Sequence, residues 1–209
     1  PLLPAGFYYK TFMWPAKLWE TYEYFIRKSA GLGVSPTERD PDIYDHKYYH
    51  CDVLIIGSGP AGLTAASIAV KSGKKVLLVD EKPDLGGSLV GSDSELTKIN
   101  DATPKDWVDK TLSDLSKNKN IKILNRTSVA AYHNYNYLIM MQRLTDHLNE
   151  EEKQNKIRQR LWKVRAKKVI LATGSIERMM VFDCNDRPGI MLSSAVRKYL
   201  NHYGVKCGN

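Results

Sequence analysis

Cysteine is scarce in this sequence, and no apolar stretch is long enough to cross a membrane. The three cysteines, Cys51, Cys184 and Cys207, are widely spaced and include no C-x-x-C pair. This pattern excludes a disulfide scaffold and a dithiol redox centre within the chain. No apolar run approaches the ~20 residues of a membrane helix, and the first residues do not resemble a signal peptide. We therefore expect a cytoplasmic protein that is not embedded in a membrane.

Histidine is also sparse, and its spacing does not favour a metal site or a catalytic base. His46, His50 and Cys51 form H-x-x-x-H-C, which suits a metal only on a helix. Two tyrosines intervene, Cys51 leads directly into a predicted strand, and no fourth ligand is apparent. The other three histidines are isolated in the sequence: His133, His147 and His202. We expect no metal ligand and no catalytic residue in this chain.

Acidic residues are few in the last part of the chain. The net charge of the 209 residues is +8, and residues 151–209 contain 13 Lys/Arg against 5 Asp/Glu. A nucleic-acid partner is one explanation of such a basic region. We favour a solvated hairpin over 153–168, because its basic residues lie outside apolar Leu161 and Val164, and only Trp162 is available to stack on a base. We therefore expect no nucleic-acid partner.

The most informative stretch is CDVLIIGSGPAGLTAASIAVKSGKKVLLVDEK, residues 51–82. Its apolar run 53–56 ends directly in glycine and predicts a buried parallel strand. Gly57, Gly59 and Gly62 follow as G-x-G-x-x-G. In that motif the first glycine permits a sharp turn, the second lets backbone amides approach a pyrophosphate, and the third lets the helix pack on the strand. The stretch therefore predicts the start of a dinucleotide-binding unit.

A helix, a second strand and an acidic pair complete this unit. The alanine-rich helix from Ala61 to Ser72 directs its free N–H groups at phosphates. The strand 76–79 then leads into Asp80-Glu81, and a carboxylate there accepts the hydroxyls of an adenosine ribose and repels a 2′-phosphate. The order favours NAD or FAD over NADP, although the adjacent Lys82 weakens that exclusion. The alternative is a βαβ unit with a tight turn and no ligand.

The remaining pattern predicts an α/β, Rossmann-like FAD/NAD(P)-binding fold. The run 86–88, Gly-Gly-Ser, either approaches the dinucleotide, with Ser88 donating to a phosphate, or forms a plain turn. A third parallel strand is predicted at 121–124, and alternation over about 128–166 indicates a small antiparallel sheet inserted as a crossover. The strand 168–171 returns to the parallel sheet and leads into Ala172-Thr173-Gly174, whose small residues suit backbone contact with the dinucleotide.

The first 30 residues are unusually aromatic, and they include an apolar stripe at helical spacing after Pro15. The stripe packs either on the dinucleotide-binding domain or on a domain or subunit outside this chain, and we favour the second. We expect an aromatic helical segment and linker over 1–50 and a dinucleotide-binding domain over 51–209. The chain begins without methionine and ends just after a helix-like segment, so we expect it to be a piece of a longer polypeptide, with its fold incomplete at the C-terminal end.

Five blocks of the sequence are shared with a known family: PAGFYYKTFMWP (4–15), AGLG (30–33), the glycine motif with Asp80-Glu81, ATG (172–174) and NDRPGIML (185–192). Together they resemble the alpha subunits of heterotetrameric sarcosine oxidases over essentially the whole chain. The first and last blocks are specific, whereas the glycine motif alone indicates only flavoproteins with two dinucleotide-binding domains. Subunits of opine oxidase, hydrogen cyanide synthase and dye-linked proline dehydrogenase share the core but are less expected to carry the opening block.

The resemblance implies noncovalent NAD in this chain and partners that do the chemistry. In the family, FAD in the beta subunit oxidises sarcosine with O2 to glycine and hydrogen peroxide, and the methylene group passes to tetrahydrofolate. FMN lies between alpha and beta, and zinc belongs to delta. The implied partners are the beta, gamma and delta subunits and the rest of alpha. The positions that match the NAD contacts of the family are Ala61, Asp80, Glu81, Lys82, Ser88 and Val129. Family members often have arginine or glutamine near Lys82. The glycine motif and the small-residue run add Gly57, Gly59, Pro60, Gly62, Thr173 and Gly174 as candidate cofactor-binding residues.

Two alternatives stay open. The predicted pocket lacks an evident acid–base pair, nucleophile or dithiol, so we expect the chain to hold a cofactor rather than to perform bond chemistry. In the first alternative that cofactor is FAD, in a subunit of a related amine, opine or proline dehydrogenase. In the second, the aromatic segment from Phe7 to Phe25 docks a partner, and the nucleotide is ancillary.

Overall fold

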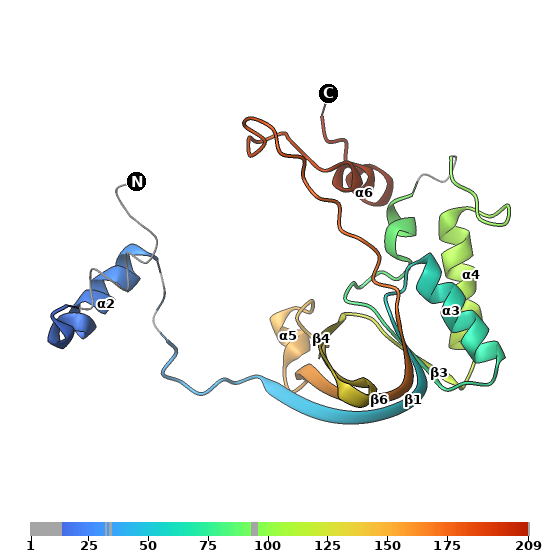
Figure 1. Ribbon diagram of the computed structural model, residues 1–209, viewed down its shortest axis with the longest axis horizontal. Helices are drawn as coiled ribbons and strands as arrows, with labels where there is room; N and C mark the ends of the chain where they lie inside the picture. Colours follow the sequence, from blue (N-terminus) through green and yellow to red (C-terminus); the bar gives the residue numbers. More distant parts are fainter. Residues whose placement is uncertain (1–13, 32, 34, 93–95, 209) are drawn as a thin grey trace. The chain divides into compact units, whose positions relative to one another are not determined.

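The computed structural model describes residues 14–31, 33, 35–92 and 96–208. The chain divides into two units, Pro1–Pro41 and Asp42–Asn209, which are described separately (Figure 1). The first contains the 3-10 turn η1 (Ala16–Leu18) and helix α2 (Trp19–Ser29), so the helix predicted after Pro15 is confirmed. The aromatic residues at 7–12, which begin the segment considered for partner docking, lie outside the described residues.

The second unit is built on one mixed sheet of six strands, in the order β3-β2-β1-β6-β5-β4. The strands are β1 (Ile43–Ile56), β2 (Val76–Val79), β3 (Ile121–Leu124), β4 (Thr127–His133), β5 (Tyr137–Arg143) and β6 (Ile157–Leu171). Strand β1 pairs in parallel with β2 and β6, and β2 pairs in parallel with β3. Strand β5 pairs antiparallel with β4 and β6. The predicted α/β, Rossmann-like class is confirmed.

Strands β1 and β6 are longer than the sequence predicts. Strand β1 starts at Ile43, within the expected linker, and β6 is one continuous strand where two were expected. The two strands pair from Ile43 opposite Ile157 to Ile56 opposite Leu171. Residues 43–50 thus belong to the sheet, and the division of the chain falls between Pro41 and Asp42.

Side chains along the first part of this long pairing explain its extension. The carboxylate of Asp45 accepts bonds from two nitrogens of the Arg160 guanidinium, with the shortest at 2.7 Å. The rings of Tyr49 and Trp162 meet edge to face, with centroids 6.3 Å apart. Such cross-strand pairs stabilise a sheet, but they join residues that are more than a hundred positions apart and give no local pattern.

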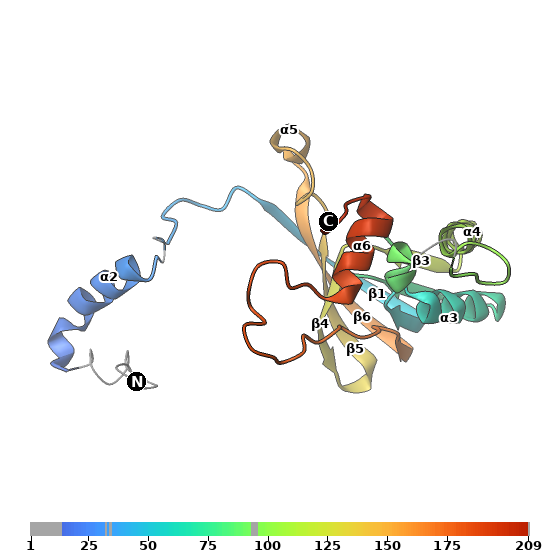
Figure 2. The same ribbon diagram turned by 90° about the horizontal axis from the view of Figure 1, so that it is seen from above.

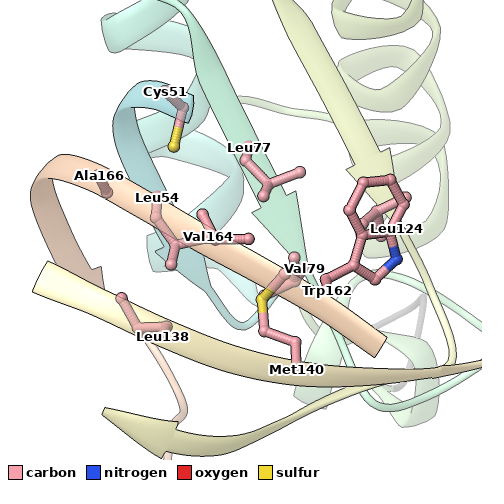
Figure 3. Close-up of a cluster of buried hydrophobic side chains, with 10 residues drawn as sticks. All are labelled: Cys51, Leu54, Leu77, Val79, Leu124, Leu138, Met140, Trp162, Val164 and Ala166. Atoms are coloured by element: carbon pink, nitrogen blue, oxygen red, sulfur yellow. The ribbon is translucent and has the colours of Figure 1, made fainter. Parts of the chain in front are cut away.

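Two apolar cores lie on opposite faces of the central strands, as expected from the alternation of side chains along a strand. Leu77 and Val79 of β2 point to one core, which includes Trp162 (Figure 3). Val76 and Leu78 point to the other core, which is covered by the helices α3 and α4. The indole N–H of Trp162 donates to Oε1 of Gln142 at 2.9 Å, which satisfies both buried polar groups.

The helical elements of the second unit are α3 (Pro60–Lys71), η2 (Gly87–Gly91), α4 (Pro104–Ser116), η3 (Asn134–Asn136), α5 (Glu150–Lys153) and α6 (Ser193–Tyr203). Helices α3 and α4 lie side by side on one side of the sheet (Figures 1 and 2). The last helix, α6, packs against η2, where the side-chain amide of Asn201 donates to the carbonyl of Gly91 at 3.0 Å (Figure 2). This contact connects the last helix to the segment that follows β2 in the sequence.

Candidate functional site

The candidate site lies at the carboxyl ends of β1, β2 and β6, where three loops meet. The amide of Gly57 donates to the carbonyl of Val79 at 2.8 Å, and the amide of Ala172 donates to the carbonyl of Ile56 at 2.8 Å. These bonds hold the turn after β1 between the loops that follow β2 and β6. We call these three segments, 57–59, 80–88 and 172–174, the three-loop junction. Ligands of open α/β sheets bind at this edge, outside the carboxyl ends of the strands.

Steric contact explains why the first turn needs glycine. Gly57 has a φ of +101°, and a Cβ there would lie 2.2 Å from the carbonyl oxygen of Ala172. A Cβ on Gly62 would lie 1.9 Å from the carbonyl oxygen of Gly57. No side chain larger than hydrogen fits either position, and the turn is thereby held close to α3.

Helix α3 begins at this turn with an open N-terminus. Gly59 is the N-cap, Pro60 occupies the first helical position, and no side chain caps the helix. Pro60 and Ala61 are exposed. The unpaired amides of the first turn and the positive end of the helix dipole therefore face outward, which suits the phosphates of a nucleotide.

The two acids after β2 are placed differently. Oδ2 of Asp80 accepts from the backbone N–H of Ser58 at 2.7 Å and from its hydroxyl at 2.6 Å. Oδ1 of Asp80 accepts from the backbone N–H of Lys82 at 2.9 Å. Glu81 is exposed, and its carbonyl oxygen accepts from the Arg143 guanidinium at 3.0 Å. Asp80 thus serves the turn, while the carboxylate of Glu81 faces solvent.

The second glycine pair packs on the first turn. The amide of Gly86 donates to the carbonyl of Ser58 at 3.1 Å and lies 3.3 Å from its hydroxyl oxygen. A Cβ on Gly87 would come within 2.7 Å of the Cα of Gly59. Ser88 lies next in η2 and is exposed. The predicted pair is therefore part of the three-loop junction, together with Ser58, which the motif treats as an arbitrary residue between two glycines.

The other candidate residues surround this junction. The amide of Thr127 donates to the carbonyl of Asp80 at 2.8 Å, which places the start of β4 beside the acidic pair. Val129, two residues further along β4, is partly buried and packs on the core that contains Trp162. Thr173 is exposed, and its Cα would lie 3.2 Å from a Cβ on Gly57.

Lys82 and Gly174 lie at the rim of the junction. Both are exposed. The carbonyl of Lys82 accepts from the amide of Arg126 at 3.1 Å, which joins this residue to the turn before β4. Gly174 has a φ of +70°, and a Cβ there would meet no atom within 4 Å. The main chain at Gly174 is therefore open to solvent.

The His46, His50 and Cys51 cluster, which is not expected to bind a metal, lies on β1. His46 and His50 are in an extended strand, so their Cα atoms are about 13 Å apart at ~3.3 Å per residue. Burial raises the pKa of the Cys51 thiol to about 11, which keeps it protonated at neutral pH. Across the described ranges, no group of three or more His, Cys, Asp and Glu is placed to hold a metal.

No helix in the described part of the chain has the length and apolarity that a membrane span requires.

Comparison with known proteins shows which family the part of the chain that contains this junction resembles. Residues 52–184 match the family described as FAD dependent oxidoreductase. The chain is 45% identical over its whole length to the sarcosine oxidase subunit alpha of Rhizobium meliloti (strain 1021), and covers 21% of that protein. It is 46% identical over 179 residues to the same subunit of Corynebacterium sp. (strain P-1), which covers 86% of this chain and 18% of that protein.

A solved structure has a similar fold over most of this chain. The L-proline dehydrogenase from P. horikoshii superposes with a TM-score of 0.59 at 28% identity, and the match covers 78% of this chain and 30% of that chain. The chain thus spans about a fifth of the curated relatives it matches. The resemblance to sarcosine oxidase alpha subunits, inferred from five short blocks, is confirmed by these relatives.

Proposed function

The chain belongs to the family of FAD-dependent oxidoreductases, and from that premise we propose that it is the dinucleotide-holding part of the alpha subunit of a flavin-dependent sarcosine oxidase. The observation that carries the proposal is the three-loop junction, which joins an open helix N-terminus to an outward-facing acid. The identity of 45% to a sarcosine oxidase subunit alpha supports the choice among flavin enzymes.

The residues at the junction fit an adenine dinucleotide. The exposed carboxylate of Glu81 suits the hydroxyls of the adenosine ribose, whereas the carboxylate of Asp80 is already bonded by Ser58 and Lys82. The amides of Gly59 to Ala61 suit the diphosphate. We propose Gly57, Gly62, Lys82, Ser88, Val129, Thr173 and Gly174 as further contacts or supports of the same site.

The dinucleotide in this proposal is NAD, with FAD as the alternative. Bound FAD would supply redox chemistry, whereas NAD would be structural or ancillary here. The test is to denature the purified protein and record the absorbance of the released cofactor. Adenine absorbance without flavin bands supports NAD, flavin bands support FAD, and no released nucleotide together with no binding of added NAD or FAD refutes the proposal.

In the proposed complex, beta, gamma and delta subunits and further domains of alpha complete the enzyme in the cytoplasm. Sarcosine, O2 and tetrahydrofolate would give glycine, hydrogen peroxide and methylenetetrahydrofolate, with the amine oxidised outside this chain. The proposal therefore expects no sarcosine-dependent peroxide from this chain alone. Peroxide formation by the folded chain without partners would contradict this division of labour.

The aromatic unit supports a second candidate function, which is partner docking. Trp14 is 82% exposed, and Tyr24 and Phe25 are each 61% exposed. Tyr24 and Phe25 lie on α2, and Trp14 lies shortly before that helix; exposed aromatics grouped in this way favour an interface. If Glu81→Ala changed neither nucleotide retention nor assembly of the complex, docking with an ancillary nucleotide would become the better description.

A further inference from the structure

Ser58 lies at the centre of the three-loop junction and is completely buried. Its backbone N–H and its hydroxyl both donate to Oδ2 of Asp80, at 2.7 and 2.6 Å. Its carbonyl accepts from the amide of Gly86 at 3.1 Å, and that amide also approaches the hydroxyl oxygen at 3.3 Å. One residue thus bonds to the loop after β2 at two separate points.

The hydroxyl both donates and accepts at this place. A serine hydroxyl has one hydrogen to donate and lone pairs to accept. Here the hydrogen is directed to Asp80, and an oxygen lone pair faces the amide of Gly86. Alanine would remove both contacts and leave Asp80 with one fewer donor in a partly buried setting, where such losses are costly.

These bonds set the position of two other groups. Asp80 is held toward the turn, so that the adjacent Glu81 is the acid left facing solvent. Gly86 is held against the turn, and this brings Gly87 onto Gly59, the N-cap of α3. The Gly86-Gly87 loop, which lies beside the N-terminus of α3, is therefore held in place by the buried side chain of Ser58.

We propose that Ser58 is a positioning residue that assembles the diphosphate half of the site by holding the Gly86-Gly87 loop against the start of α3. The inference rests on the proposed dinucleotide function. Ser58 is buried and does not touch the ligand; its hydroxyl acts through Gly86, whereas its backbone N–H, which alanine retains, still holds Asp80. Its loss should therefore weaken ligands that span the diphosphate more than ligands that end at the adenosine monophosphate.

The test compares NAD, FAD and AMP on the whole chain after bound nucleotide has been removed, with dissociation constants measured by calorimetry. For Ser58→Ala we expect at least tenfold weaker binding of whichever dinucleotide the protein takes, and less than a twofold change for AMP. For Glu81→Ala we expect AMP and the dinucleotide to weaken together. A role of Ser58 in overall stability alone would shift AMP and dinucleotide equally.

A second variant covers the case in which Ser58→Ala does not fold. Asp80→Asn removes the carboxylate that receives the Ser58 hydroxyl, and we expect the same selective loss of dinucleotide. In the double variant the loss should be no larger than in Ser58→Ala alone, because that variant already removes the hydroxyl through which Asp80 would act on Gly86.

The outcomes separate the two ideas. If the unmodified chain binds neither NAD nor FAD, the proposed function fails and this inference fails with it. If it binds one of them and Glu81→Ala weakens that binding, the proposed function stands. An equal effect of Ser58→Ala and Asp80→Asn on AMP and dinucleotide, or no effect on either, would then overturn the positioning role alone.

Discussion

At the residue scale, the account assigns different work to Asp80 and Glu81. Asp80 accepts three hydrogen bonds from the protein, whereas Glu81 is exposed beside an open helix N-terminus. The sequence predicted an acid at this position but did not distinguish the two, because both follow the strand directly. The distinction arises from Ser58, whose bonds join residues 22 positions apart.

The first prediction compares these two acids. Glu81→Gln should weaken nucleotide binding about tenfold or more, equivalent to about 1.4 kcal/mol, and leave the free energy of unfolding of the nucleotide-free protein unchanged. Asp80→Asn should lower that free energy by about 1–3 kcal/mol, because it disrupts bonds to a half-buried carboxylate. Calorimetric binding and urea unfolding measure the two effects. An exchange of the two results between the variants would contradict the assignment.

The second prediction concerns the turn at Gly57. Alanine there would combine a φ of +101° with a Cβ 2.2 Å from the carbonyl oxygen of Ala172. Gly73 is a matched control, because its φ is +70° and a Cβ there meets nothing within 4 Å. Gly73→Ala should cost about 1–2 kcal/mol, and Gly57→Ala at least twice as much, with loss of nucleotide binding. Equal unfolding free energies for the two variants would show that the turn tolerates a side chain.

At the element scale, the ends of β1 and β6 show where local pattern fails as a guide. The apolar halves of both strands were predictable, because they are short β-branched runs beside glycine. The polar half of β1 was not, since Asp45 finds its partner Arg160 only in the folded sheet. The first half of β6 was expected in the antiparallel insert, but not as one strand with 168–171. The salt bridge lowers the pKa of Asp45, chiefly through the hydrogen bond from Arg160.

The third prediction follows from this pair. Asp45→Asn should destabilise the protein by about 1 kcal/mol at neutral pH and increase hydrogen exchange in residues 43–50. The folded-state pKa of Asp45 is lowered, so its contribution is present above the unfolded value and is lost as pH falls through the folded value. The variant and the parent should therefore converge in acid. A constant difference between them at all pH values would contradict the electrostatic origin.

The fourth prediction concerns α6, whose N-terminus is capped from a distance. Glu177 accepts from the Ser193 hydroxyl and from the amide of Ser194, both at 2.7 Å. These bonds lower its pKa from 4.5 to about 2. The cap therefore stabilises α6 fully above about pH 4.5 and is lost as the pH falls toward 2.

Hydrogen exchange of α6 as a function of pH tests this cap. Protection should fall between about pH 4.5 and 2 in the parent, and Glu177→Gln should show reduced protection without that pH step. Lys153–Glu150 provides a control ion pair on α5, so Glu150→Gln should leave α6 unchanged. An unaltered pH step in Glu177→Gln would show that another group controls the helix.

At the scale of the whole molecule, the sequence predicts the order of strands and helices better than the contacts between the loops of the candidate site. Four parallel strands, the glycine turn and an antiparallel insert each have a local pattern, and the observed fold contains all of them. The junction of three loops has no such pattern. It depends on Ser58 and on glycine contacts between segments that only the fold brings together.

The most direct measurement of the central claim is a structure of the protein with NAD or FAD bound. The account predicts the ribose hydroxyls on the carboxylate of Glu81, the diphosphate at the amides that begin α3, and Asp80 still bonded to Ser58. A nucleotide bound elsewhere, or a ribose held by Asp80 with Glu81 turned away, would contradict it.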